Sequence, residues 1–185
     1  DSSSVCSAAV VYNFPVPEGD LCDSTVNGLS QNTSPFNAAL DYSGTPSGHL
    51  RAFSLTTQGT TRDYTINGID VGINTNSAIA PITVNIYLAS QISGSINGKS
   101  VPLSGVVQPY ASAVSLVPAG GAFTHNVPMN VFLPAGTQFI VEVISPSSRD
   151  FMVAYNNAGG GNPANETAAG YLGPVGGNGT YLLPS

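Results

Sequence analysis

Few side chains in this 185-residue sequence have the types and spacing that catalysis requires. The two histidines are His49, which precedes an apolar segment, and His125, which lies in the apolar phase of a long alternating segment. Neither has a Gly-x-Ser-x-Gly turn beside it, so we expect His125 to be a semi-buried core residue rather than a general base. Glu142 lies in a strongly apolar segment, and no second carboxylate can be assigned opposite it to make a glycosidase pair. The sequence therefore predicts a protein that is not an enzyme, with Glu142 facing outward from its strand or paired with an arginine.

Hard oxygen ligands occur together near the N-terminus, where Glu18, Asp20 and Asp23 share a glycine-containing loop. Carboxylate oxygens are ligands that Ca²⁺ prefers, so calcium is the one cofactor that the sequence suggests. The three acids do not follow the spacing of a known calcium loop. The alternative is that they are solvated loop residues.

Carbohydrate modules present flat aromatic faces to sugar rings, and this chain offers eight tyrosines but no tryptophan. Tyr110, Tyr155 and Tyr171 lie in or beside loop-like segments, where they would form a platform for a glycan. The alternative is that each tyrosine covers an edge of the core.

A disulfide between Cys6 and Cys22 would close a loop of about 15 residues and stabilise the fold by roughly 3 kcal/mol. The alternative is a pair of reduced, buried thiols. The chain begins Asp-Ser-Ser-Ser, which we interpret as the start of a mature, secreted protein that is extracellular or on the cell surface. The sequons at Asn32, Asn165 and Asn178 lie in loop-like surroundings and matter if the source glycosylates its secreted proteins.

The elements that position these residues are predicted to be strands. Because 21 glycines and 14 prolines are scattered along the chain, no window keeps an apolar repeat of helical period. Alternation of period two instead predicts strands in the segments 51–57, 82–89, 123–133 and 151–155, with shorter candidates at 8–14 and 181–183. The segment 139–144 is apolar on both phases, so a strand covered on both faces is predicted there.

Two local signals refine this pattern. Pro128 cannot donate to a strand ladder, so part of the segment 123–133 is predicted to be an edge or a bend. Between Tyr64 and Ile73 the apolar phase slips by one residue at Asn67-Gly68, which predicts a β-bulge.

About eight or nine strands without intervening helices predict one all-β domain over residues 1–185. The most economical architecture is an antiparallel two-sheet β-sandwich of the jelly-roll kind, with long loops and little helix. Two stretches rich in Gly, Asn, Ser and Thr, residues 19–48 and 158–179, are expected to be ordered loops packed on the sandwich or flexible connectors.

Several segments resemble the secreted bacterial jelly-roll accessory domains of the adhesion or carbohydrate-binding type. The resemblance is carried by the Pro-Ala-Gly-Thr turn that leads from Leu133 into the apolar run ending at Val143, and by the strand patterns at 49–55, 64–73 and 84–88, with Asn156-Asn157 beyond them. It covers about residues 49–160 and rests on hydrophobic pattern and turns. It implies a noncatalytic adhesion or carbohydrate-binding role at a surface.

Charged residues make up only 8% of the chain, which carries a formal net charge of -6. Its four basic residues cannot neutralise a nucleic-acid backbone or hold the chain on an anionic membrane. The apolar run Ala8 to Tyr12 is far shorter than the roughly 20 residues that a membrane span needs. The expected partners are therefore copies of the protein itself, as a homopolymer, or a surface polysaccharide.

Two functional hypotheses follow. The first is a structural or adhesive subunit that forms an extracellular filament or surface polymer through strand pairing between copies. Its assembly strand would lie in residues 1–17 and present Ala8, Val10, Tyr12 and Phe14, the alternative being an ordinary edge strand within one chain. The second is a carbohydrate-binding, lectin-like module, which the predicted sandwich and the extracellular setting support by analogy of fold.

Overall fold

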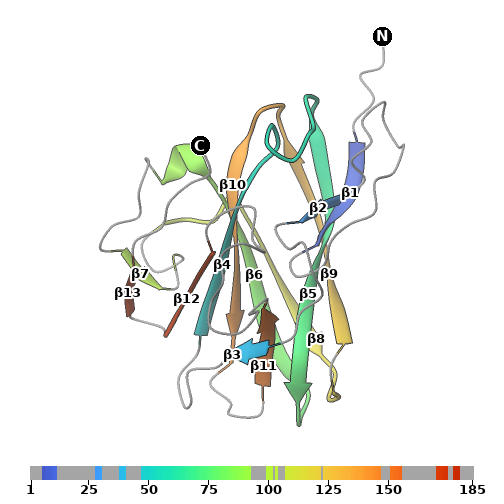
Figure 1. The fold of residues 1–185 in the computed structure, drawn as a ribbon, viewed down its shortest axis with the longest axis vertical. Coiled ribbons are helices and arrows are strands. Elements are labelled where there is room, and N and C mark those ends of the chain that lie inside the picture. The colour runs from blue at the N-terminus through green and yellow to red at the C-terminus, as the bar shows by residue number, and fades with distance from the viewer. Residues whose placement is uncertain are drawn as a thin grey trace.

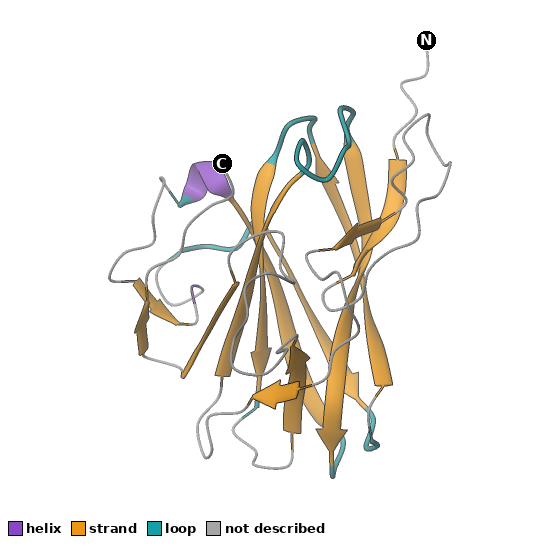
Figure 2. Ribbon diagram, viewed as in Figure 1, coloured by secondary structure: helices purple, strands orange, loops and turns teal. Residues whose placement is uncertain are grey.

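The computed structural model describes residues 6–11, 28–30, 38–40, 47–92, 99–101, 103, 107–121, 123–146, 151–155, 170–174 and 177–179. Side chains are described within 48–73, 77–92, 103, 107–121 and 123–146. These parts are almost entirely β-strands arranged in two main sheets, with one short 3-10 turn, η1 (Ala89–Gln91) (Figures 1 and 2). The all-β prediction is confirmed; the jelly-roll order and the number of strands stay predictions.

The first sheet, sheet I, is built around the long strand β5 (Tyr64–Asn76). One side of β5 pairs with β9 (Phe123–Leu133), and the other side pairs first with β1 (Cys6–Val11) and then with β11 (Phe151–Tyr155). Two strands of three residues, β2 (Gly28–Ser30) and β3 (Ala38–Leu40), extend the sheet beyond β1 and β11. The pairing of β1 with β2 and β5 is parallel, whereas the expected sandwich was antiparallel. Parallel neighbours need a long crossover, and the chain between β1 and β5 is long enough to provide one.

The second sheet, sheet II, has the strand order β12 (Gly170–Pro174), β4 (Ser47–Ser54), β10 (Gln138–Ser145), β6 (Ala80–Leu88) and β8 (Ala111–Val117). All its neighbours are antiparallel. A separate small ladder joins β7 (Lys99–Val101) to β13 (Gly177–Gly179).

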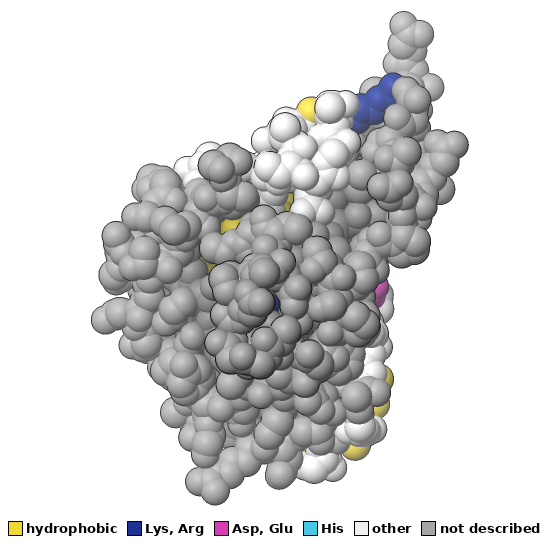
Figure 3. Space-filling model, in the orientation of Figure 1, with side chains coloured by type: hydrophobic (Ala, Val, Ile, Leu, Met, Phe, Trp, Pro, Cys, Tyr) yellow, Lys and Arg dark blue, Asp and Glu magenta, His cyan; other side chains and the backbone are white. Residues whose placement is uncertain are grey.

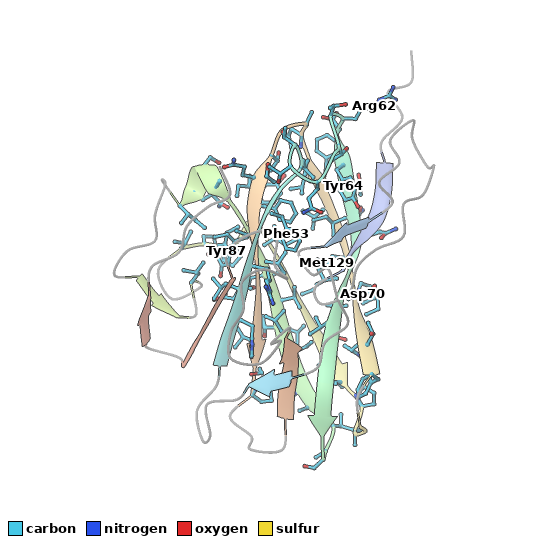
Figure 4. All side chains as sticks on the ribbon, viewed as in Figure 1. Phe53, Arg62, Tyr64, Asp70, Tyr87 and Met129 are labelled. Carbon is cyan, nitrogen blue, oxygen red and sulfur yellow. The ribbon has the colours of Figure 1, made fainter. Side chains whose placement is uncertain are left out.

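The main hydrophobic core lies between the two sheets and is formed by the apolar phases that the sequence shows. Phe53 of β4 and Phe139 of β10 stack with ring centroids 5.3 Å apart, and Figure 4 shows Phe53 in the interior. Every fully buried isoleucine or leucine removes apolar surface from water and contributes roughly 1.5–3 kcal/mol. The buried members of this core include Leu55, Ile66, Ile73, Ile82, Ile86, Val117, Val127 and Val143.

The β-bulge predicted at Asn67-Gly68 is confirmed. The register between β5 and β9 shifts between Ile66 and Gly68, and β1 shifts at the same place. Because successive strand residues face opposite sides, one extra residue lets apolar positions of both phases reach the core. The residues on either side of the bulge, Tyr64, Ile66, Ile69, Val71 and Ile73, are all fully buried.

Pro128 lies in β9, which pairs with β5 alone within the part of the chain that the structure describes. The expectation that part of this segment is an edge is therefore confirmed. Proline suits an edge strand because it has no backbone N–H to donate to a second neighbour.

Strand β10 is covered on both faces, as its continuous apolar run predicts. Its inner face joins the main core, and Ile140 on its outer face belongs to a second cluster. This outer cluster combines β4, β6 and β10 with the segment that runs from β6 to β8; its buried members are Leu50, Ala52, Tyr87, Ile92, Leu103 and Ile140.

Candidate functional site

Glu142 lies on the outer face of sheet II, but it is fully buried beneath the segment between β6 and β8. Its Oε2 accepts hydrogen bonds from Nδ2 of Asn85 at 3.0 Å and from the hydroxyl of Tyr87 at 2.8 Å. Its Oε1 accepts the backbone N–H of Leu103 at 2.7 Å. Glu142 therefore faces outward from its strand, which is one of the two expected alternatives, but the segment above it buries the carboxylate, and its three donors here are not arginines. Three donors occupy the carboxylate, so it ties Leu103 to the sheet rather than facing a substrate.

The Glu142 cluster continues to the last strand of sheet II. Asn85, which donates to Glu142, accepts a hydrogen bond of 2.7 Å from the hydroxyl of Ser112 in β8. A chain of polar contacts therefore crosses β10, β6 and β8. It fixes the position of β8 relative to the buried part of the sheet.

His125 of β9 and Ser115 of β8 join the two sheets at the side of the sandwich where these strands lie next to each other (Figure 1). The Oγ of Ser115 and Nε2 of His125 are 2.9 Å apart, and both side chains are half-buried. Burial lowers the pKa of His125, so the imidazole is neutral at neutral pH. Among the described residues no carboxylate contacts this ring to orient it, as the base of a catalytic triad requires. The pair acts as a link between sheets.

His49 of β4 faces the space between the sheets together with Arg51. Both side chains are buried. Burial lowers the pKa of His49 to about 3, and the positive charge of Arg51 acts in the same direction. His49 is thus a neutral interior residue at any pH near neutrality.

Several predicted site residues lie outside the described parts of the chain. The possible calcium ligands Glu18, Asp20 and Asp23, together with Tyr12, Phe14, Cys22, Asn32 and Asn165, belong to this group. Others lie in described strands whose side chains are not described: Cys6, Ala8 and Val10 in β1, Tyr155 in β11, Tyr171 in β12 and Asn178 in β13. The disulfide, the calcium site and the sequons therefore stay predictions. Within the described residues, no group of three or more His, Cys, Asp or Glu side chains is placed to hold a metal ion.

Tyr110 is the predicted glycan contact whose side chain is described. It is 44% exposed and lies immediately before β8. Its hydroxyl donates to the backbone carbonyl of Phe132 in β9 at 3.1 Å, and Phe132 is itself 46% exposed. Two partly exposed aromatic residues therefore lie at the junction of β8 and β9.

Strand β8 is an element that the alternation pattern did not predict. Three of its four inward positions carry small residues, Ala111, Ala113 and Ser115, and only Val117 is a large one, while its outward positions include Val114 and Leu116. This reverses the usual pattern of large apolar residues inside, so the segment lacks the ordinary strand signal. The available signal was a run of eight residues without Gly, Pro or charge, bounded by Pro109 and Pro118.

The free edge of β8 is apolar and uncharged. Within the described residues β8 pairs with β6 alone, so its other side has no strand beside it. Val114 is 68% exposed, Leu116 is 66% exposed and Ile79, which precedes β6, is 69% exposed. The sequence between Asp70 and Glu142 contains a single charged residue, Lys99, so β6, β8 and β9 carry no charge.

Charged side chains of the described residues lie elsewhere. On the face drawn in Figure 3, dark blue appears at the upper right and magenta on the right flank, where Figure 4 places Arg62 and Asp70. Asp70 accepts a hydrogen bond of 2.7 Å from Asn126 across the outer face of sheet I.

Comparison of the chain with protein-family models, with curated proteins and with solved structures finds no match. Among the described residues, no helix has the length and apolar character needed to cross a membrane.

Proposed function

We propose that this chain is a noncatalytic, secreted structural or adhesive subunit that assembles into an extracellular filament or surface polymer through strand pairing between copies. The fold proposed for the subunit is a jelly roll. The observation that carries the proposal is the way in which β1 enters sheet I.

Strand β1 runs parallel to β5, from Cys6 opposite Tyr64 to Val11 opposite Asp70. No tight hairpin connects the two strands, because parallel neighbours are joined by a crossover. The hydrogen bonds that hold β1 against β5 involve backbone groups, which the same strand of another copy offers equally well. A strand that is held in this way and joined to its neighbour by a long connection is a candidate for exchange between copies.

The composition of β1 supports such an exchange. Its sequence, Cys-Ser-Ala-Ala-Val-Val, has no charged side chain that would oppose pairing with a second copy. Without β1, β5 would have no strand beside it from Tyr64 to Asp70 on the side opposite β9. Its backbone N–H and C=O groups there would lack partners, which costs free energy wherever water does not reach them. Either the chain's own β1 or that of a neighbour removes this cost.

The positions of three titratable residues in the sandwich support a noncatalytic role. Glu142 is occupied by three donors, His49 is buried between the sheets, and His125 links β8 to β9. Each of the three has a structural explanation.

A paired-cysteine experiment tests the exchange of β1. Ser7 and Thr65 are opposite each other in the register of β1 and β5. In a chain whose native cysteines are replaced by alanine, S7C and T65C together should form, under mild oxidation, a ladder of covalent multimers on a nonreducing gel. The two single variants are the matched controls, and each should stop at monomers and dimers.

Two results would contradict the exchange of β1 and the assembly of copies. If the double variant oxidises completely and migrates as a monomer, β1 pairs within its own chain. If the unmodified protein also sediments as a monomer at high concentration and shows no filaments by electron microscopy, the assembly function is wrong.

A carbohydrate-binding module is the second candidate, and the exposed pair Tyr110 and Phe132 favours it. Aromatic faces stack on the apolar faces of sugar rings. In a polysaccharide pull-down run with and without calcium, Tyr110→Ala should abolish retention, whereas Tyr87→Phe, which alters a buried tyrosine, should retain it. Failure of the unmodified protein to bind any polysaccharide tested would exclude this candidate.

A further inference from the structure

The edge strands of the described sandwich differ in how well they are protected from pairing with another chain. Strands β2 and β3 have three residues each, β12 contains two glycines and ends at Pro174, and β9 contains Pro128. Short length, proline and charge are the features by which proteins protect sheet edges. Among the described edge strands, β8 has seven residues and none of these features.

We infer that β8 is an interaction surface whose partner is β8 of a second copy, paired antiparallel about a two-fold axis at Val114. In this arrangement Val114 lies opposite its own counterpart, and Ser112 lies opposite Leu116. The inference rests on the proposed self-assembly, but the surface is separate from β1. Strand β8 belongs to sheet II and β1 to sheet I.

Backbone geometry supports an antiparallel partner. In an edge strand, alternate residues direct their N–H and C=O groups away from the neighbouring strand. No residue of β8 is a proline, so none lacks a backbone N–H. A second β8 running in the opposite direction would bond to the groups between Ser112 and Leu116 that point away from β6, and it would make the two copies of sheet II continuous.

The exposed side chains fit the same arrangement. Val114 and Leu116 project from the outer face of β8 and are about two-thirds exposed. Across the two-fold axis they would form one apolar strip, to which Ile79 is adjacent because Ala80 pairs with Val117. Their burial would remove apolar surface from water, which favours association.

The distribution of charge fits a copy of the same chain as the partner. Each copy has a net charge of -6, so two copies repel each other in most orientations. Strands β6, β8 and β9 have no charged residue, so this side is one on which copies can meet without placing like charges opposite each other. A highly charged partner would find no complementary group on β8.

The edge is also held in place before any partner arrives. Ser112 is bonded to Asn85, Ser115 to His125, and the N–H of Tyr110 to the carbonyl of Ile86 at 2.8 Å. A strand fixed at three points loses little further conformational freedom on pairing, which favours association.

A charge-swap experiment tests this pairing in the full-length chain. Because Val114 would lie opposite itself, Val114→Lys and Val114→Glu should each weaken self-association by about tenfold or more, since like charges then meet at the axis. An equimolar mixture of the two variants should regain association, as Lys then faces Glu. The matched control is Thr56→Lys, which adds the same charge at an exposed position after β4, three strands from β8 in sheet II.

Sedimentation velocity provides the readout, and circular dichroism of each variant confirms folding. Association that is unchanged in both Val114 variants would overturn the β8 pairing and leave the assembly function standing. Unmodified protein that is monomeric at all concentrations would overturn both. As a second measurement, Val114→Cys in the cysteine-free background should give a covalent dimer on mild oxidation, and Thr56→Cys should not.

Discussion

The hydroxyl of Tyr87 in β6 donates a hydrogen bond of 2.8 Å to Oε2 of Glu142 in the neighbouring strand β10. Both residues are fully buried on the outer face of sheet II. The carboxylate also binds Asn85 and the N–H of Leu103, so a single acid anchors the segment that covers this face.

Replacing Glu142 by glutamine should strongly destabilise the fold. The amide places a donor where the carboxylate accepts from three donors, and it removes the charge that strengthens these bonds. We expect the free energy of unfolding to fall by about 3 kcal/mol for E142Q and by about 1 kcal/mol for Y87F, which removes a single donor. Urea denaturation measures both. A larger loss for Y87F than for E142Q would contradict the central role of the carboxylate.

His49 should make stability depend on pH in the acid range. The unfolded chain binds a proton at His49 near the ordinary pKa of 6.5, but the folded chain does so only near 3. Between these values protonation favours the unfolded state. Stability is therefore lost as pH falls, by up to about 1.4 kcal/mol per pH unit.

The control for this prediction is His49→Gln, which has no group that titrates in this range. Subtracting its stability curve from that of the unmodified protein isolates His49, because the acidic residues and His125 contribute to both. A difference that stays constant from pH 6.5 to pH 3 would show that His49 is protonated equally in both states.

Gly68 should tolerate a side chain only if Asn126 gives way. A Cβ at Gly68 would lie 2.7 Å from Nδ2 of Asn126, which also donates to Asp70. Gly68→Ala should displace the amide and break this bond, with a loss of about 1 kcal/mol. The double variant with Asn126→Ser should lose less than the sum of the two single changes. Additive losses in thermal unfolding would argue against this contact.

The bond between Ser115 and His125 should contribute to the attachment of β8 to β9. Ser115→Ala removes the hydroxyl from a half-buried imidazole nitrogen, and we expect a loss of about 1 kcal/mol. Ser115→Thr keeps the hydroxyl and is the matched control, since β-branched residues suit strands. Equal stability of the two variants would show that the bond contributes nothing.

Period-two alternation predicted the strands that have a large apolar face. The bounds of β9 and β11 coincide with the predicted segments 123–133 and 151–155. The bulge was also predictable, because a phase slip beside Asn67-Gly68 is a local property of the sequence. Residues 19–48 and 158–179 have no such pattern, and the short strands β2, β3, β12 and β13 lie within them.

The candidate sites were harder to predict because their partners are far apart in the sequence. Glu142 binds residues 39 to 57 positions away, so its strand alone gives no sign that its outer face is covered. Strand β8 was missed because alanine and serine occupy its inner phase up to Val117, while Val114 and Leu116 lie outside.

The sequence by itself determined the all-β class and the low charge of this protein, since alternation, glycine and proline content and charge are properties of the chain read in order. Only the tertiary structure decided which strands end the sheets and what covers each face. The reason is physical: the edge or interior position of a strand depends on neighbours brought together across long stretches of chain, and so does the burial of Glu142.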